Sequence, residues 1–242
     1  MTLPPINTAA RFRRKLHAWF RVRGRDLPWR RTRDPYRILV SELMLQQTQV
    51  SRVVDYYARF LERFPTVHDV ARARPGRVRE AWAGLGYYAR ARNLHALARQ
   101  VTDRGRAEVA AFPTTPEELR ELPGVGAYTA GAVASFAFER RAALVDTNVA
   151  RVLSRVFAPT LNPKSARDQR QLWAIAEHIL PRTGRATWTH NQSLMELGAL
   201  VCTARVARCS ECPVRAVCAS AQPTTTDVRR SRTPARRTAH RG

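Results

Sequence analysis

Four cysteines lie close together near the end of the sequence. They follow the spacing C-x6-C-x2-C-x5-C, and the chain contains no others: Cys202, Cys209, Cys212 and Cys218. Four thiolates at such spacing can enclose one metal centre. Zinc usually takes its ligands as two short cysteine pairs, whereas only Cys209 and Cys212 form such a pair here. The spacing therefore favours an iron–sulfur cluster, with structural zinc as the alternative.

Two acidic residues have sequence neighbours that would favour different protonation states of their carboxyl groups. Glu42 lies among apolar residues such as Leu39 and Leu43, and a glutamate buried there would have a raised pKa and could donate a proton. Asp146 precedes a helical stretch that begins near Thr147, where the helix dipole and free N–H groups favour an ionised carboxylate. Taken separately, Glu42 could be a surface glutamate and Asp146 a plain helix cap. Together they offer the proton donor and the negative charge that cleavage of a bond to a sugar requires.

A third stretch could hold a phosphate group. In Leu122-Pro-Gly-Val-Gly126, two glycines let the backbone turn tightly and present N–H groups at the start of the next helix. The stretch follows a capping box at Thr115–Glu118, which predicts a short helix that continues to Leu122. The geometry of such a turn is suited to one phosphate group.

The net charge also points to a nucleic acid. The 242 residues include 42 basic and 19 acidic ones, for a formal charge of +23, and a surface this positive favours a polyanionic partner. With 44% hydrophobic and 25% charged residues, the composition is that of a globular protein. No stretch reaches the roughly 18 apolar residues of a membrane span. The N-terminus lacks the apolar core of a secretory signal, so we expect a reducing, cytoplasmic compartment and association with the nucleoid.

The segments that must position these residues have the sequence pattern of helices almost throughout. Apolar positions recur at helical spacing from Val50 to Phe64, where Pro65 ends the run. No alternating pattern typical of strands persists. The sequence therefore predicts an all-α protein. From residue 219 the periodic apolar residues give way to threonine, proline and arginine, which predicts a disordered basic tail over 219–242.

The cysteine spacing and the L-P-G-V-G turn resemble the endonuclease III and MutY branch of helix-hairpin-helix DNA glycosylases. This resemblance implies a two-lobed fold: a six-helix barrel with the hairpin over 29–138, and an iron–sulfur domain made of 1–28 and 139–218. It implies a [4Fe–4S] cluster that organises a basic loop beside DNA. It also identifies Asp146 as the catalytic aspartate and Asn148 as its polar neighbour. Endonuclease III-type enzymes carry a lysine where this chain has Tyr128, so the resemblance implies a glycosylase without lyase activity.

Three stretches resemble the MutY-type adenine glycosylases specifically: Asp26–Val50, Gly84–His95 and His190–Cys202. In this family, Glu42 matches the general acid, and Tyr128 is expected to aid Asp146 in stabilising the sugar cation. The resemblance assigns the base pocket to Arg25, Leu27, Trp29, Arg30 and Gln192. It assigns DNA contacts to Gln46, Gln47, Tyr87, Leu122, Gly124, Val125 and Gly126. Gln46 would enter the base stack, and Tyr87 would act as a wedge that helps to extrude the target base.

The resemblance thus implies an enzyme, acting as a monomer on mismatched double-stranded DNA, that removes adenine paired with guanine or 8-oxoguanine. Typical MutY enzymes continue into a second domain that recognises 8-oxoguanine; the sequence is expected to lack it, which leaves the opposite-base preference open. One alternative is a thymine or uracil glycosylase acting opposite guanine, and Gln192 argues against it. An endonuclease III-like lyase is disfavoured by Tyr128. A non-catalytic iron–sulfur DNA-binding protein would have no need of Glu42, Asp146 and Asn148.

Overall fold

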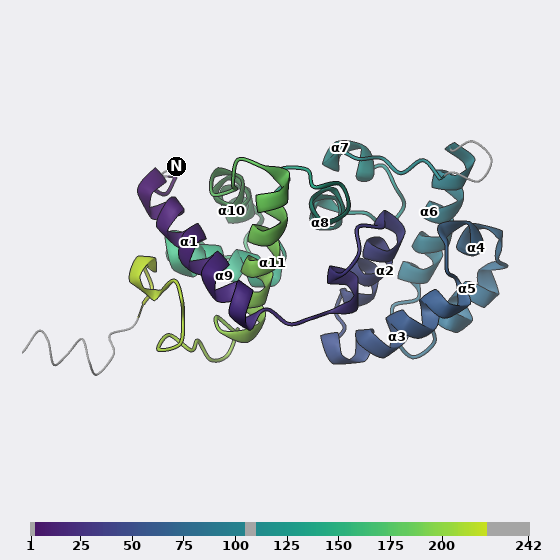
Figure 1. The fold of residues 1–242 in the computed structure, drawn as a ribbon, viewed down its shortest axis with the longest axis horizontal. Coiled ribbons are helices and arrows are strands. Elements are labelled where there is room, and N and C mark those ends of the chain that lie inside the picture. The colour runs from purple at the N-terminus through teal and green to yellow at the C-terminus, as the bar shows by residue number, and fades with distance from the viewer. Residues whose placement is uncertain (1–2, 105–109, 222–242) are drawn as a thin grey trace, which may run out of the picture.

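The computed structural model describes residues 3–104 and 110–221, and helices account for most of them (Figure 1). The α-helices are α1 (Ile6–Arg23), α2 (Pro35–Leu45), α3 (Val50–Arg63), α4 (Val67–Arg72), α5 (Pro75–Ala81), α6 (Ala89–Arg104), α7 (Pro116–Leu119), α8 (Ala127–Phe138), α9 (Thr147–Phe157), α10 (Ala166–His178) and α11 (Gly184–Leu200). Two short 3-10 turns, η1 and η2, cover Pro28–Arg30 and Arg215–Val217. Within the described ranges the only extended pairing is an isolated bridge between Cys202 and Ala207. The predicted all-α class is confirmed.

Local sequence signals fix most of the helix ends. Helix α3 begins at Val50 and ends before Phe64, as predicted, because the residue before Pro65 is pushed out of the helical conformation. Thr115 forms the predicted capping box with Glu118. The short helix α7 nevertheless ends at Leu119 rather than at Leu122. Beyond it, single turns carry the chain into Gly124, whose φ of 77° is left-handed and therefore suits glycine.

The helices form two groups that lie side by side in Figure 1. In one group, α1 and α9 both pack against α11, and α10 packs against α9. In the other, α2 packs against α3 and α8, while α4 and α5 pack against α6. Contacts between α8 and α11 join the two groups. The N-terminal helix therefore lies beside helices from the far end of the sequence. The exact domain boundaries stay a prediction. The predicted tail over 219–242 lies almost wholly outside the described residues.

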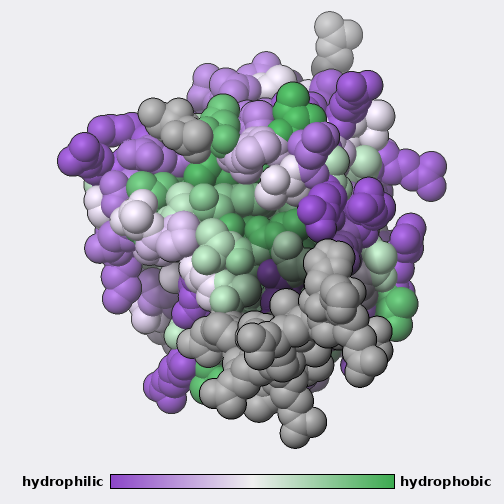
Figure 2. All heavy atoms as spheres, turned by 90° about the vertical axis from the view of Figure 1, so that its left-hand side faces the viewer, coloured by the Kyte–Doolittle hydropathy of each residue, from purple (hydrophilic) through white to green (hydrophobic). Residues whose placement is uncertain are grey.

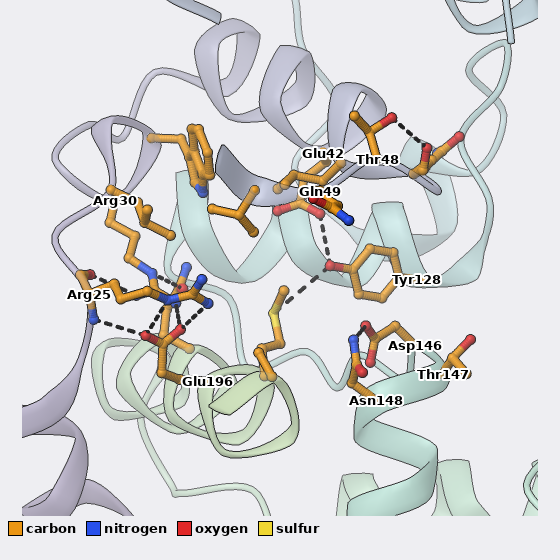
Figure 3. A pocket seen from close by; sticks show the side chains of 18 of the residues that line it. Arg25, Arg30, Glu42, Thr48, Gln49, Tyr128, Asp146, Thr147, Asn148 and Glu196 are labelled. Carbon is orange, nitrogen blue, oxygen red and sulfur yellow. Dashed lines mark hydrogen bonds and ion pairs between the residues drawn. The ribbon is translucent and has the colours of Figure 1, made fainter. Parts of the chain in front are cut away.

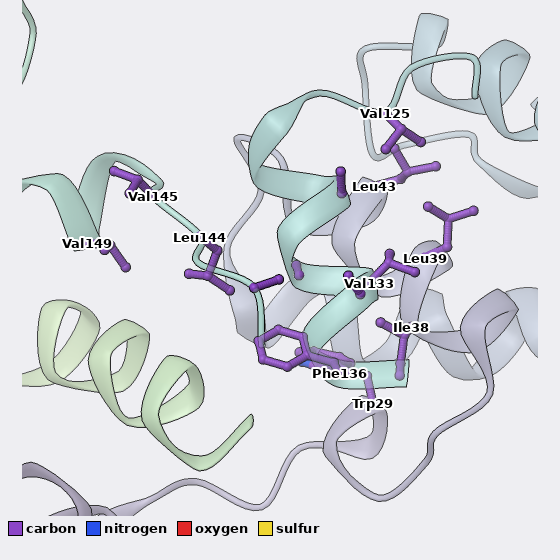
Figure 4. Packing of buried hydrophobic residues seen from close by; sticks show 14 of the residues in the cluster. Trp29, Ile38, Leu39, Leu43, Val125, Val133, Phe136, Leu144, Val145 and Val149 are labelled. Atoms are coloured by element: carbon purple, nitrogen blue, oxygen red, sulfur yellow. The ribbon is translucent and has the colours of Figure 1, made fainter. Parts of the chain in front are cut away.

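Helices α2 and α8 provide the core behind the functional residues. The two helices pack against each other, and the buried core includes Leu39 and Leu43 on α2 and Val133 and Phe136 on α8 (Figure 4). Glycine lets α8 approach its neighbour closely, because a Cβ on Gly131 would lie 2.1 Å from the carbonyl oxygen of Ala143. The segment that leads to α9 is thereby held against the core.

A second close approach involves α11. A Cβ on Gly198 would lie 2.9 Å from the Cβ of Asn148 at the start of α9. Glycine at this position allows α11 to pass directly behind the first turn of α9.

The α1 side of the molecule combines apolar and polar surface. Figure 2 views this side, and apolar side chains gather in the middle of the face, with hydrophilic ones around them. The large exposed apolar side chains of the described residues include Leu3, Ile6 and Val22. No helix in the described part of the chain is long and apolar enough to cross a membrane.

Candidate active site

A cavity of about 680 Å³ lies where η1, α2, α8, α9 and α11 converge. Figure 3 shows its side chains. The residues that line it are Arg25, Leu27, Trp29, Arg30, Glu42, Leu45, Gln46, Gln47, Thr48, Gln49, Val50, Tyr128, Asp146, Thr147, Asn148, Gln192, Met195, Glu196 and Ala199. All nine residues predicted for catalysis and for the base pocket are among them. Residues more than a hundred positions apart in the sequence thus surround one space.

Glu42 is buried on α2, with 3% of its surface exposed. Its Oε2 accepts a hydrogen bond of 2.8 Å from the Tyr128 hydroxyl. Burial is the main cause that raises the pKa of Glu42 to about 7, and the negative charge of Asp146 adds to the rise. The Tyr128 hydrogen bond and the charge of Arg30 act in the opposite direction. Glu42 can therefore hold a proton near neutral pH and release it there.

Tyr128 makes a contact that the sequence did not predict, because its hydroxyl donates to Glu42. The reason is the packing of α8 on α2, which directs the first turn of α8 toward Glu42. The expected help of Tyr128 to Asp146 in stabilising the sugar cation stays a prediction. Burial, with the charges of Glu42 and Asp146, raises the pKa of Tyr128 well above its ordinary value. The hydroxyl thus stays protonated as a hydrogen-bond donor.

Asp146 caps α9, as the sequence predicted. Its Oδ1 accepts from the backbone N–H of Val149 at 2.6 Å, and its Oδ2 accepts from the amide of Asn148 at 3.1 Å. These two donors fix the Asp146 carboxylate at the start of α9. Figure 3 shows Glu42 and Asp146 on two sides of the cavity, with Tyr128 between them.

Asn148 is itself held by a residue that the sequence analysis missed. Arg151 donates from Nη2 to Oδ1 of Asn148 and to the carbonyl oxygen of Gly198, both at 2.8 Å. Its Nε donates to the carbonyl oxygen of Cys202 at 2.9 Å. One arginine therefore connects the neighbour of Asp146 to the first cysteine of the loop.

Glu196 is the second residue that was missed. Its side chain is fully buried on α11, where it accepts hydrogen bonds from Arg25 and Arg30. Burial acts to raise the pKa of Glu196, but the hydrogen bonds from Arg25 and Arg30 and the charge of Arg30 together outweigh it and lower the pKa to about 2. Its apolar neighbours Leu194 and Leu197 are the same kind of signal that singled out Glu42 in the sequence.

Some residues predicted to contact DNA lie outside the cavity. Gln46 and Gln47 line it, whereas Tyr87, Leu122, Gly124, Val125 and Gly126 do not. Tyr87 is 61% exposed with a left-handed φ of 48°, and the guanidinium of Arg90 lies over its ring, 5.3 Å from the ring centroid. The side chains of Leu122 and Val125 are buried. The hairpin can therefore offer a partner its backbone groups, but not these two side chains.

The four cysteines line a second cavity, of about 360 Å³. All four are free thiols. Burial is the main cause that raises the pKa of Cys212 to about 11, and the other three cysteines influence it as well. Arg155 approaches Cys202 Sγ at 3.4 Å, and Arg205 and Arg208 also line this cavity. Within the described residues, no group of three or more His, Cys, Asp or Glu side chains is arranged to hold a metal ion.

Comparison with known proteins places this geometry in context. Residues 40–178 match the profile of the HhH-GPD superfamily base excision DNA repair proteins. The chain is 44% identical to the adenine DNA glycosylase of Rattus norvegicus over 220 residues, which cover 87% of this chain and 42% of that protein. It is 37% identical to the thymine-DNA glycosylase of Aeropyrum pernix, covering 85% of this chain and 92% of that protein. A solved structure of a thermostable thymine-DNA glycosylase superposes with a TM-score of 0.78 at 30% identity, covering 88% and 96% of the two chains.

Proposed function

Because this chain belongs to the HhH-GPD superfamily of base excision DNA repair proteins, we propose that it is a monofunctional DNA glycosylase. Its proposed substrate is adenine mispaired with guanine or 8-oxoguanine in double-stranded DNA. The chain spans less than half the length of the adenine glycosylase from Rattus norvegicus, so the opposite base is part of the proposal. The observation that carries it is one cavity with Glu42 and Asp146 on two of its walls, each in a different environment.

The two carboxyl groups suggest the order of events. The target base leaves the stack and enters the cavity, and Glu42 donates its proton to the purine ring. The base then leaves as a neutral molecule while positive charge develops on the sugar. Asp146, held by Asn148 and Val149, stabilises that charge until water attacks. Tyr128 holds Glu42 in place through its hydroxyl.

The absence of a nearby amine supports base release without strand cleavage. Cleavage through a Schiff base needs an amine nucleophile, and none of the residues that line the cavity is a lysine. The two lysines of the chain are Lys15 and Lys164, of which the first lies on α1 and the second in the loop before α10. We therefore expect an abasic site as the product.

We propose that Cys202, Cys209, Cys212 and Cys218 hold a [4Fe–4S] cluster. The fit rests on the donor set, because four free thiols line one cavity together with Arg205 and Arg208. The four thiols are not arranged around a single metal ion, so the proposal concerns the larger cluster. When bound, the cluster would organise this loop rather than take part in base release. The two arginines would then face DNA phosphate. Broad visible absorption of the purified protein would support iron and sulfur, whereas a colourless protein with one equivalent of zinc would contradict this proposal.

A thymine or uracil glycosylase acting opposite guanine is the second candidate. It is favoured by the thymine-DNA glycosylase of Aeropyrum pernix, because this chain covers 92% of that protein but only 42% of the rat adenine glycosylase. Gln192 in the cavity favours adenine. A non-catalytic DNA-binding protein with the same scaffold would not require the paired Glu42 and Asp146.

We propose that the active protein lies in the cytoplasm, bound to the nucleoid as a monomer.

One assay separates these candidates. Duplexes that carry adenine opposite guanine, adenine opposite 8-oxoguanine, thymine opposite guanine or uracil opposite guanine are incubated with the protein and divided into two portions. Only one portion is then treated with alkali. We expect strand breaks only in the adenine duplexes and only after alkali. Breaks without alkali would indicate a lyase, and breaks confined to thymine or uracil would establish the second candidate. The variant Glu42→Gln is the control for contaminating activity.

A further inference from the structure

Glu196 is the most fully occupied carboxylate of the cavity. Its Oε1 accepts from the backbone N–H of Arg25 at 2.9 Å and from Nε of the same residue at 2.8 Å. Its Oε2 accepts from Nη2 of Arg25 at 2.9 Å and from Nη2 of Arg30 at 2.8 Å. A carboxylate has about four acceptor positions, so these four donors leave Glu196 little capacity to bind a base directly.

Arg30 passes this constraint on to a second residue of α11. Its guanidinium donates from Nη2 to Glu196, from Nη1 to the carbonyl oxygen of Arg25 and from Nε to Oε1 of Gln192 at 2.7 Å. The planar guanidinium is a rigid fork, so fixing Nη1 and Nη2 also fixes the direction of Nε. Glu196 and Gln192 are four residues apart on one helix, which places both side chains on the same face.

This contact determines which end of the Gln192 amide is available. Arginine carries only donors, so it must take the carbonyl oxygen of the amide. The amide nitrogen of Gln192, which is a donor, is then the group left to meet a base in the cavity. Without Arg30 the amide could turn over and offer its oxygen instead.

We propose that Glu196 is a positioning residue that sets base specificity: it holds Arg25 and Arg30, and Arg30 orients the Gln192 amide as a donor toward an acceptor atom of the base. This inference rests on the proposed glycosylase function and extends it. The base that binds in the cavity would then present an acceptor atom, either an unprotonated ring nitrogen or a carbonyl oxygen, to α11. Glu196 acts through other side chains and does not touch the base itself.

A double-mutant cycle tests whether Glu196 acts through Gln192. Base release is measured in single turnovers for the wild type, Glu196→Gln, Gln192→Leu and the double variant, on the substrate that the wild type cleaves best. We expect Glu196→Gln to slow base release by roughly tenfold to a hundredfold alone, the range of coupling within one network. In the Gln192→Leu background the same change should cost less than about threefold, because the amide to be oriented is absent. Glu177→Gln, which removes an exposed ion pair with Arg141, is the matched control and should change neither rate.

The possible outcomes distinguish this inference from the proposed function. Equal losses from Glu196→Gln in both backgrounds would overturn the positioning role, whichever base is released. If Glu196→Gln does not fold, Glu196→Asp keeps the charge but withdraws it from Arg30, and the same comparison is made. If the wild type releases no base, the proposed function fails. The double-mutant cycle is then measured with the dissociation constants of duplexes that carry a 2′-fluorinated adenosine or thymidine. Additive effects of the two substitutions on binding of both duplexes would overturn the inference.

Discussion

Replacing Tyr128 by phenylalanine should move the pH dependence of base release upward. Burial raises the pKa of Glu42 to about 7 even though the hydroxyl of Tyr128, which donates to Glu42 at 2.8 Å, acts to lower it. A hydrogen bond to a charged group contributes about 1.5–3 kcal/mol. At about 1.36 kcal/mol for each pKa unit, its loss should raise the pKa of Glu42 by roughly one to two units. In the proposed function, base release needs protonated Glu42. The rate of the wild type should therefore fall above pH 7, and the rate of Tyr128→Phe should fall only one to two pH units higher.

The assay is a series of single-turnover measurements between pH 5 and pH 9. At pH 5.5 both proteins hold the proton on Glu42, so their rates should be similar, whereas at pH 8.5 the variant should be faster. Tyr36→Phe is the control, because it removes a buried hydroxyl that donates to the carbonyl oxygen of Phe64, away from the cavity. A falling limb that stays in place or moves to lower pH in Tyr128→Phe would refute the role of this hydrogen bond.

Three further changes probe other parts of the structure. Asp146→Asn keeps a good helix cap but removes the negative charge, so base release should fall by at least about a hundredfold while thermal stability stays nearly constant; a large fall in melting temperature would contradict this. Arg151→Leu removes a charged hydrogen bond to Asn148 and should slow base release by roughly tenfold, with DNA affinity measured in parallel and expected to hold. Burial is the main cause that lowers the pKa of His17 to about 4 and that of His190 to about 3. Their neutral forms stabilise the fold above pH 6.5, and this stability is lost as the pH falls toward 4 and 3. Urea unfolding at pH 7 and pH 5 should therefore show a loss in the wild type that is smaller in His190→Phe.

Sequence reasoning succeeded where a local pattern decides the outcome. The apolar neighbours of Glu42 indicated a buried carboxyl, and the structure buries it. The position of Asp146 before a helical run indicated a cap, and it accepts from Val149. Both features depend on residues within one or two turns of the chain.

Contacts between distant segments were beyond the reach of such patterns. Arg25 and Glu196 lie 171 positions apart, so nothing near either residue indicates the pairing. The same holds for Arg151, whose partners lie on two other segments. The sequence linked Tyr128 only to Asp146, and the packing of α8 on α2 decides that its hydroxyl donates to Glu42.

At two positions, glycine leaves no room for a side chain, because a Cβ there would displace the segment that carries Asp146. Gly131 and Gly198 contact neither carboxyl group, yet each admits backbone or side-chain atoms of the segment around Asp146 at distances that a methyl group would forbid. Alanine at either position would push that segment outward and carry the carboxylate with it. Under the proposed function, substitutions that alter no charge and remove no hydrogen bond would therefore slow base release.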